Sequence, residues 1–454
     1  MDAILGEVTI RQRRKKLEEM TQGNGLSEAY TASLSRLKAQ KGYKSILGLK
    51  VLMWVLYSER PLRTEELCHA LGVEIGSAEL DPENIPAIRT LMSSCLGLVT
   101  VEEFSSTVRL VHFTLQEHLL RDPTLFHSPH LEIAEVCLTY LNFRSIRCLP
   151  PTLRSAPVTE HLLEYASVYW GSHARREITE NIKLLALRLL YRFEGHISAQ
   201  LLLLYGRNKF LGLWFYGTEG PRGFTGLHGV ALLGLAGIIA ALLDMKEWDV
   251  SAADCTGNTA LTWAARQGND GVVKVLLERE DVNPNQADTE CGRTPLLWAA
   301  EKGHKEVVKI LLEREDIDPN KADAEYGQTP LSRAVQRGHE GIAKMLLERE
   351  DVDPNQVDTK YCLTPLLWAA EGGHERVVKM LLKREDINPN QADTKYRQTP
   401  LSRAVQRRHE GIAKMLLERK DVDPNQADTQ YCLTPLSWAA EGGHERVEIG
   451  RAHV

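Results

Sequence analysis

The chain has 454 residues, of which 43% are hydrophobic and 26% are charged, and its formal net charge is -6. Because a single compact core rarely exceeds about 300 residues, this length predicts two or three folding units. The ordinary composition excludes a disordered or fibrous chain. The negative charge argues against nucleic acid as the main partner, since binding to phosphates needs clustered cations.

The eight cysteines form no CxxC pair, and the N-terminus has no apolar signal core. Both features predict a reducing intracellular location, cytoplasmic with the nucleus as an alternative, and neither disulfides nor structural zinc are expected. The first segment, residues 1–40, contains the basic run RQRRKK. That run favours a solvated amphipathic helix over a nuclear targeting signal.

Residues 41–145 carry a non-repeating pattern of helices followed by a small β-hairpin. This order predicts a winged helix, which is an α+β fold. The expected elements are a helix in ILGLKVLMWVLY, a helix capped at Thr64 after a break at Pro61, a third helix in ENIPAIRTLMSSCLGL, strands at residues 98–102 and 108–113, and a closing helix. The presumed recognition helix has Arg89 as its only cation, so we expect it to pack against protein rather than read DNA.

Several segments of this half resemble one protein class. SERPLRTEELCHAL, LMSSCLGLVTV, VRLVHFTLQEHL, EVCLTYLNF and LLEYASVYWGSHAR are similar to the winged helix that follows the NACHT nucleotide-binding module in fungal STAND proteins. That class resembles the NLR immune receptors of animals and plants. The resemblance implies that residues 1–40 are the helical tail of a missing NACHT module. Residues 146–222 are expected to form a helical connector.

The same resemblance implies that His112 touches the phosphates of a nucleotide if a separate NTPase module is present. The alternative is that His112 is an ordinary strand residue. The sequence contains no GxxxxGK[ST] motif, so we expect no cofactor to bind this chain itself. It contains no nucleophile elbow, metal triad or dinucleotide fingerprint either, and the chain is not expected to be an enzyme.

The second half of the chain is a repeat. Thr-Pro pairs occur at Thr294, Thr329, Thr364, Thr399 and Thr434, each 35 residues after the last, and Thr259-Ala260 lies one period earlier. In the unit at Thr364, Thr suits a helix N-cap and Pro suits the first helical position. Gly372-Gly373 ends that helix, and a second helix is expected from His374. A hairpin of this size cannot bury its own apolar stripes, so it must stack on its neighbours.

The pattern T-P-L-x-x-A-A-x-x-G-H-x-x-V-V-x-x-L-L resembles the ankyrin repeat. The resemblance implies a C-terminal α-solenoid of about seven repeats over residues 223–447, the last one truncated, that binds a protein partner and no nucleic acid, membrane or small-molecule substrate. The family's fourth-position His remains only as His228, and the period is about two residues longer, which we place in the turn. The repeat also accounts for residues 224–243, whose hydropathy imitates a membrane span.

The position after that His alternates between Trp and Arg, and we call its six residues the Trp/Arg column: Trp263, Trp298, Arg333, Trp368, Arg403 and Trp438. Because Trp and Arg are enriched at binding hot spots, one hypothesis places the column on a concave face as the partner-binding residues. Trp298→Ala with Trp368→Ala should then abolish partner capture and leave the melting transition nearly unchanged. The alternative is that each Trp packs between inner helices, with Arg stacked on it.

Three further features of the repeats carry expectations of their own: Arg408, the DVDPNQ segments and a set of polar residues. Arg408 stands where Gly338 ends the helix in a nearly identical unit, so a left-handed backbone there should cost about 1 kcal/mol. DVDPNQ, at residues 351–356 and 421–426, lacks the Gly and Glu of a calcium loop and predicts a turn without a metal. A solvated rim is expected from Glu301, Lys302, Gln336, Arg337, Glu371, Gln406 and Arg407.

The last residues, 448–454, leave the repeat. IGRAHV is the translation of DNA that resembles a common sequencing adapter, so we expect this tail to be non-native. Together the features predict a protein–protein interaction module that forms the sensor half of an NLR-like signalling protein. The alternatives are a regulatory fragment of a nucleotide-gated STAND NTPase whose P-loop lies outside this chain, and a winged-helix regulator that binds DNA.

Overall fold

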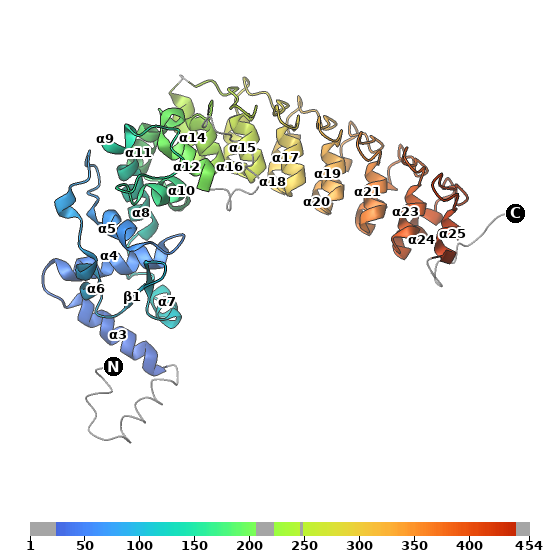
Figure 1. Cartoon of the computed structure of the whole chain (residues 1–454). Helices are drawn as coiled ribbons and strands as arrows, with labels where there is room; N and C mark the ends of the chain where they lie inside the picture. Colours follow the sequence, from blue (N-terminus) through green and yellow to red (C-terminus); the bar gives the residue numbers. More distant parts are fainter. Residues whose placement is uncertain (1–23, 206–221, 246–247, 442–454) are drawn as a thin grey trace, which may run out of the picture. The chain divides into compact units, whose positions relative to one another are not determined.

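The computed structural model describes residues 24–205, 222–245 and 248–441 (Figure 1). The chain divides into two compact units, residues 1–221 and 222–454. The expectations for the basic run and for the tail at 448–454 lie outside the described residues. The described part is mostly helical and contains a two-stranded sheet, which confirms the predicted fold class.

The first unit begins with helices and a hairpin. Its elements are α3 (Asn24–Lys38), α4 (Tyr43–Tyr57), α5 (Thr64–Gly72), the 3₁₀ turn η1 (Pro82–Asn84), α6 (Ile88–Ser94), β1 (Val99–Glu102), β2 (Thr107–Leu110) and α7 (Phe113–Leu120). The strands are antiparallel, with Val99 opposite Leu110 and Glu102 opposite Thr107. A bridge from Arg63 to Thr107 adds the chain before α5 to this sheet. Helices packed on such a hairpin form a winged helix, as predicted.

Two predicted boundaries in this fold are wrong. The second strand ends at Leu110, because His112 already caps α7: its Nδ1 accepts a hydrogen bond from the N–H of Thr114 at 3.2 Å. Likewise Thr64 is the first residue of α5 rather than its cap, and the N–H of Arg63 donates to Oε2 of Glu66 at 2.8 Å. Arg60 binds the same buried carboxylate through bonds of 2.8 and 2.7 Å, so the charge of Glu66 is paired.

The rest of the first unit is helical, as expected for the connector. It comprises α8 (Pro129–Leu141), α9 (Arg144–Arg147), α10 (Leu163–Ala174), α11 (Glu180–Leu190), the 3₁₀ turn η2 (Phe193–Gly195) and α12 (Ile197–Tyr205). α8 and α10 pack closely, and Tyr140, Tyr165 and Trp170 are fully buried there. Large buried aromatic rings contribute much of the apolar area that stabilises such a helical layer.

The second unit consists of paired helices. They are α13 (Gly226–Leu233), α14 (Ala236–Asp244), α15 (Ala260–Gln267), α16 (Asp270–Leu277), α17 (Pro295–Lys302), α18 (Lys305–Leu312), α19 (Pro330–Gln336), α20 (Glu340–Leu347), α21 (Pro365–Gly372), α22 (Glu375–Leu381), α23 (Pro400–Gln406), α24 (Glu410–Leu417) and α25 (Pro435–Glu441). From α15 onward the first helix of each pair is capped by the predicted threonine. Its Oγ1 accepts from the N–H three residues later at 3.1 to 3.2 Å.

The pairs stack in sequence order. The odd-numbered inner helices, α13 to α25, pack successively, and so do the even-numbered outer helices, α14 to α24, as the row of helix pairs in Figure 1 shows. The hydrophobic stretch at residues 224–243 forms α13 and α14, two short helices of the stack. Among the described residues, every helix is too short or too polar to cross a bilayer.

Histidines that precede the outer helices join neighbouring repeats. The Nε2 atoms of His304, His339 and His409 each lie 3.1 Å from a carbonyl near the end of the inner helix of the preceding repeat. The imidazole of His339 also lies against Gly303, where an added Cβ would come within 2.8 Å of it. Because Gly303 has a φ of 84°, both its backbone and its neighbour require glycine.

The long turns between repeats are held by two ladders. In each R-E-D or R-K-D segment from Arg279 to Asp421, the Arg binds the Asp two residues later through paired bonds of 2.6 to 2.9 Å. The Asn of each P-N segment from Asn285 to Asn390 donates its amide to a backbone carbonyl of the next repeat, as Asn355 does to Asp386 at 2.7 Å. The extended turns therefore contribute bonds between repeats.

Candidate protein-interaction surface

The Trp/Arg column lies on the inner helices, and its first three residues are buried. Trp263, Trp298 and Arg333 are 1%, 7% and 5% exposed, so the expectation of a solvent-facing ladder is wrong for these three. Trp368, Arg403 and Trp438 are half-buried. The geometry favours the packing alternative at the N-terminal end of the column. A partner-binding role for the column stays a prediction.

Each column residue donates to a buried aspartate at the start of its own repeat. These six residues form the Asp column: Asp254, Asp288, Asp323, Asp358, Asp393 and Asp428. Indole nitrogens approach the carboxylates at 2.8 to 3.0 Å, and Arg333 and Arg403 approach theirs at 2.7 and 3.4 Å. Sequence reasoning treated these aspartates as ordinary turn residues. Their recurrence at nearly the repeat period was the signal that could have revealed them.

The second carboxylate oxygen of each aspartate holds the turn that begins the repeat. We call these turns the fingers: residues 288–293, 323–328, 358–363, 393–398 and 428–433. Oδ1 accepts the N–H of Tyr326, Tyr361, Tyr396 and Tyr431 at 2.6 Å in the last four fingers. One buried carboxylate therefore joins each finger to its inner helix, which fixes the direction in which the finger projects.

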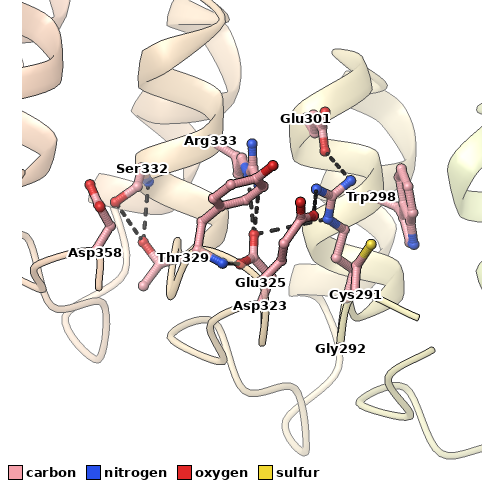
Figure 2. A network of polar contacts seen from close by, with 12 residues as sticks. Cys291, Gly292, Trp298, Glu301, Asp323, Glu325, Thr329, Ser332, Arg333 and Asp358 are labelled. Atoms are coloured by element: carbon pink, nitrogen blue, oxygen red, sulfur yellow. Dashed lines mark hydrogen bonds and ion pairs between the residues drawn. The ribbon is translucent and has the colours of Figure 1, made fainter. Parts of the chain in front are cut away.

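Figure 2 shows a charge network between the repeats of α17 and α19. Glu301 accepts from Arg293 at 3.0 Å and from Arg337 of the next repeat at 3.0 Å. Arg293 also reaches Glu325 at 3.3 Å. Glu301 is only 8% exposed, so its assignment to a solvated rim is wrong. Burial acts to raise the pKa of Glu301, but the charges of Arg293 and Arg333 hold it below its ordinary value.

In two repeats, the residue three positions after the column residue contacts the column residue of the next repeat. Arg266 stacks on Trp298, with its guanidinium carbon 4.2 Å from the ring centroid. Glu371 instead precedes an Arg-type repeat and pairs with Arg403 at 3.7 Å and with Arg407 at 2.6 Å. Cation–π stacking therefore occurs, as the packing alternative expected, but Arg266 and Arg293 provide it at Trp298 rather than the arginines of the column.

The tips of the later fingers form a row of half-buried to exposed tyrosines and exposed basic side chains, which we call the tyrosine ridge. Its members are Tyr326, Tyr361, Tyr396 and Tyr431 with Lys360, Lys395 and Arg397. The rings of Tyr326 and Tyr361 stack with centroids 6.2 Å apart, and Lys360 lies 4.1 Å over Tyr326. Tyr361 and Tyr431 meet Trp368 and Trp438 edge to face at 5.5 Å. Tyr361 and Tyr431 are 43% and 56% exposed.

Among the described residues of this unit, four with side chains hold a left-handed backbone. Arg408 has a φ of 63°, which confirms the predicted conformation at that helix end. Cys362, Arg397 and Cys432 have φ values of 58°, 53° and 55° at the finger position that glycine fills in earlier repeats. Such a conformation costs about 1 kcal/mol for a residue with a side chain. The later repeats therefore carry backbone strain that the earlier ones lack.

His112 lies at the N-terminus of α7, exposed and stacked against Phe113 with ring centroids 4.5 Å apart. It borders a cavity of about 500 Å³, together with Arg60, Arg109 and Gln116. Arg60 pairs with Glu66 and Arg109 with Glu102, the latter at 3.0 Å. His112 is thus a helix cap rather than a strand residue, and its contact with a nucleotide stays a prediction.

The D-x-D/N-P-N turns use their oxygens within the chain. Asp353 accepts the N–H of Asn355 at 2.9 Å, and its own N–H donates to Asn320. Among residues 24–205, 222–245 and 248–441, no group of three or more His, Cys, Asp or Glu side chains is placed to hold a metal ion. The eight cysteines are all free thiols in this part of the chain.

Comparison with known proteins decides the family of the second unit. A family model of ankyrin repeats matches three times, at residues 192–288, 280–358 and 350–428, which together span more than half of the 454 residues. The chain belongs to the ankyrin-repeat family. The first of these matches begins before residue 223, where the sequence placed the start of the array. This ankyrin protein also matches, at residues 35–130, the model described as the winged helix domain of GPI inositol-deacylase.

Three solved ankyrin structures are similar to the array. The ankyrin repeat domain of Bcl-3, an IκB family member, is 23% identical with a TM-score of 0.43, and the match covers 48% of this chain and 95% of that one. The domain of human ASB11 is 23% identical, with a TM-score of 0.39 and coverage of 47% and 90%. One from Acinetobacter baumannii is 30% identical, with a TM-score of 0.39 and coverage of 42% and 96%. No curated protein matches the sequence.

Proposed function

We propose that this ankyrin protein is an intracellular binding protein without catalytic activity of its own, whose array captures a protein partner and forms the sensor half of an NLR-like signalling protein. The main support for partner capture is the ankyrin array over residues 192–428, because ankyrin repeats serve as protein-interaction modules. The sensor role is supported by the winged helix that precedes the array and by the motif resemblance of that unit to STAND proteins.

The fingers and the exposed ends of the inner helices are the surface on which we place the partner. The outer helices carry the lysines Lys309, Lys344, Lys379 and Lys414, all exposed, and the bonded turn ladders occupy the edge beside them. The fingers instead expose tyrosine, the residue type most suited to rigid amphipathic contacts. The half-buried Trp368 and Trp438 flank the same surface and stay candidates for contact.

The test is affinity capture with the full chain followed by cross-linking. We expect cross-links from the captured protein to fall on residues 323–398, and Tyr361→Ser with Tyr396→Ser to abolish capture. The matched control, Lys344→Ser with Lys379→Ser on the outer helices, should capture normally. Cross-links confined to the outer helices, or no protein captured at all, would contradict the proposal.

A second candidate function is the regulatory part of a nucleotide-gated NTPase whose phosphate-binding module is supplied by another chain or segment. It is supported by the exposed His112, which borders the same cavity as Arg109. In that case the partners of the first unit include a P-loop protein. His112→Ala should lower the nucleotide affinity of that complex about tenfold without dissociating it. An unchanged affinity would remove this candidate.

A further inference from the structure

We infer that the tyrosine ridge binds an extended acidic segment of a protein partner. This inference rests on the proposed function and adds the chemistry of the ligand. The charge of the finger tips changes from negative to positive along the array. Glu290 and Glu325 occupy the tips of the earlier fingers, whereas Lys360, Lys395 and Arg397 occupy the later ones, and all five side chains are exposed.

Within the two cationic fingers, 358–363 and 393–398, no exposed acid neutralises the positive charge; the nearest acidic finger tip is that of Glu325, one repeat earlier. The carboxylates beneath the ridge, Asp358, Asp393 and Asp428, are at most 2% exposed and already accept N–H bonds from their own fingers. At the inner-helix ends, Glu371 is half-buried and its Oε1 is bound by Arg407 at 2.6 Å. A negatively charged ligand therefore meets cations at the surface and no exposed carboxylate in the fingers at 358–363 and 393–398.

The aromatic rings supply the apolar part of the contact. Lys360 lies between Tyr326 and Tyr361, 4.1 and 5.4 Å from their ring centroids, and Lys395 lies 4.8 Å from Tyr396. Each of these ammonium groups is held over a ring, so less side-chain entropy is lost when a carboxylate binds. Exposed tyrosine edges between the cations suit the aliphatic side chains and backbone of a peptide.

The spacing of the ridge defines a sequence pattern for the ligand. Packed helices lie about 8 to 10 Å apart, so successive fingers are separated by about that distance. An extended chain rises about 3.3 Å per residue, which is about three residues per repeat. A segment with Asp or Glu at every third position would therefore present one carboxylate to each cationic finger.

Single-stranded nucleic acid is the competing ligand, because cations and aromatic rings also bind bases and phosphates. The ring geometry favours a peptide. Tyr326 and Tyr361 already stack on each other, and the edge contacts to Trp368 and Trp438 fix Tyr361 and Tyr431. Bases need free ring faces along the strand, and the stacked pair offers none between its members.

The experiment is a fluorescence anisotropy titration of the full chain with a labelled (Glu-Ser-Leu) repeat peptide of about 15 residues. We expect saturable binding that weakens as the ionic strength is raised to about 0.5 M. Lys360→Glu with Lys395→Glu and Arg397→Glu should lower the affinity about tenfold or more. The control Lys309→Glu, Lys379→Glu and Lys414→Glu makes the same change in net charge on the outer helices and should bind within about twofold of the unmodified chain.

Three results would overturn the inference. They are equal binding of (Gln-Ser-Leu) and (Glu-Ser-Leu) peptides, equal losses in the ridge and control variants, and tighter binding of oligothymidylate at the ridge. The first two leave the proposed function standing if the full chain still captures a protein whose cross-links fall on the fingers. Failure of capture together with failure of the peptide to bind would remove both. Circular dichroism melting of every variant separates lost binding from lost folding.

Discussion

Trp298→Ala distinguishes the two roles considered for the Trp/Arg column. The indole is 7% exposed, so it buries most of about 200 Å² of apolar area. At about 25 cal/mol per Å² this burial stabilises the array by about 5 kcal/mol, close to the loss of about 3 to 5 kcal/mol typical of such truncations. The substitution also removes the indole donor 2.8 Å from Asp288 and the ring under Arg266. We expect the free energy of unfolding to fall by about 5 kcal/mol.

The assay is urea unfolding of the full chain followed by circular dichroism, with hydrogen exchange to locate the loss. Exchange is needed because repeat arrays unfold in segments, and the loss should concentrate in α15, α17 and α19. Trp298→Phe keeps most of the packing and should lower the free energy of unfolding by about 2 kcal/mol. This smaller loss measures chiefly the missing hydrogen bond to Asp288.

Trp368→Ala is the matched control, since this half-buried indole makes the equivalent bond at 3.0 Å. Trp368→Ala should lower the free energy of unfolding clearly less than Trp298→Ala does. The earlier hypothesis of an exposed column required both substitutions to leave stability nearly unchanged. A loss below about 1 kcal/mol for Trp298→Ala would refute the packing argument and restore that hypothesis.

Three further predictions concern other parts of the chain. Glu301→Gln removes the carboxylate closest to the buried Arg293 and should lower the unfolding free energy by about 3 kcal/mol in urea unfolding at pH 7; no loss would show that the network is dispensable. Cys362→Gly should stabilise by about 0.5 kcal/mol, whereas Gly292→Cys, whose Cβ would lie 2.7 Å from a methyl group of the next repeat, should destabilise by about 2 kcal/mol; equal effects would contradict the strain argument. Burial lowers the pKa of His196 to about 4, below its value in the unfolded chain, so its contribution to stability is lost as the pH falls from about 6.5 to 4, by about 3 kcal/mol. His196→Gln should show a shallower dependence of unfolding free energy on pH over that range, and an unchanged slope would argue against it.

The sequence predicts the architecture of the array because the capping and turn residues that define each repeat act locally. Thr364 and Pro365 start a helix, and Gly373 ends it with a φ of 75°. Helix capping and left-handed backbone conformations depend on a few neighbouring residues, so they can be recognised from the sequence without a structure. The winged helix was predictable for the same reason, apart from the end of β2 and the cap of α5.

Burial in the array was harder to predict because it depends on the neighbouring repeat. Trp298 and Trp438 occupy equivalent positions in the sequence, yet the first is buried under Arg266 and Arg293 and the second is half-exposed. Glu301 looked like a rim residue because its two arginine partners lie 8 residues before it and 36 residues after it. Asp288 was hidden by its residue type, since aspartate is common in turns whether or not it is buried.

The central claim is that the buried column holds the array together while the finger tips bind the partner. The most direct measurement compares Trp298→Phe with the triple variant Lys360→Glu, Lys395→Glu and Arg397→Glu, recording for each the unfolding free energy and the affinity for the protein captured by the full chain. The account predicts that the first loses stability and keeps affinity, while the second loses affinity and keeps stability. The account would be contradicted if Trp298→Phe lowered the affinity and kept the unfolding free energy while the triple variant lowered the unfolding free energy and kept the affinity.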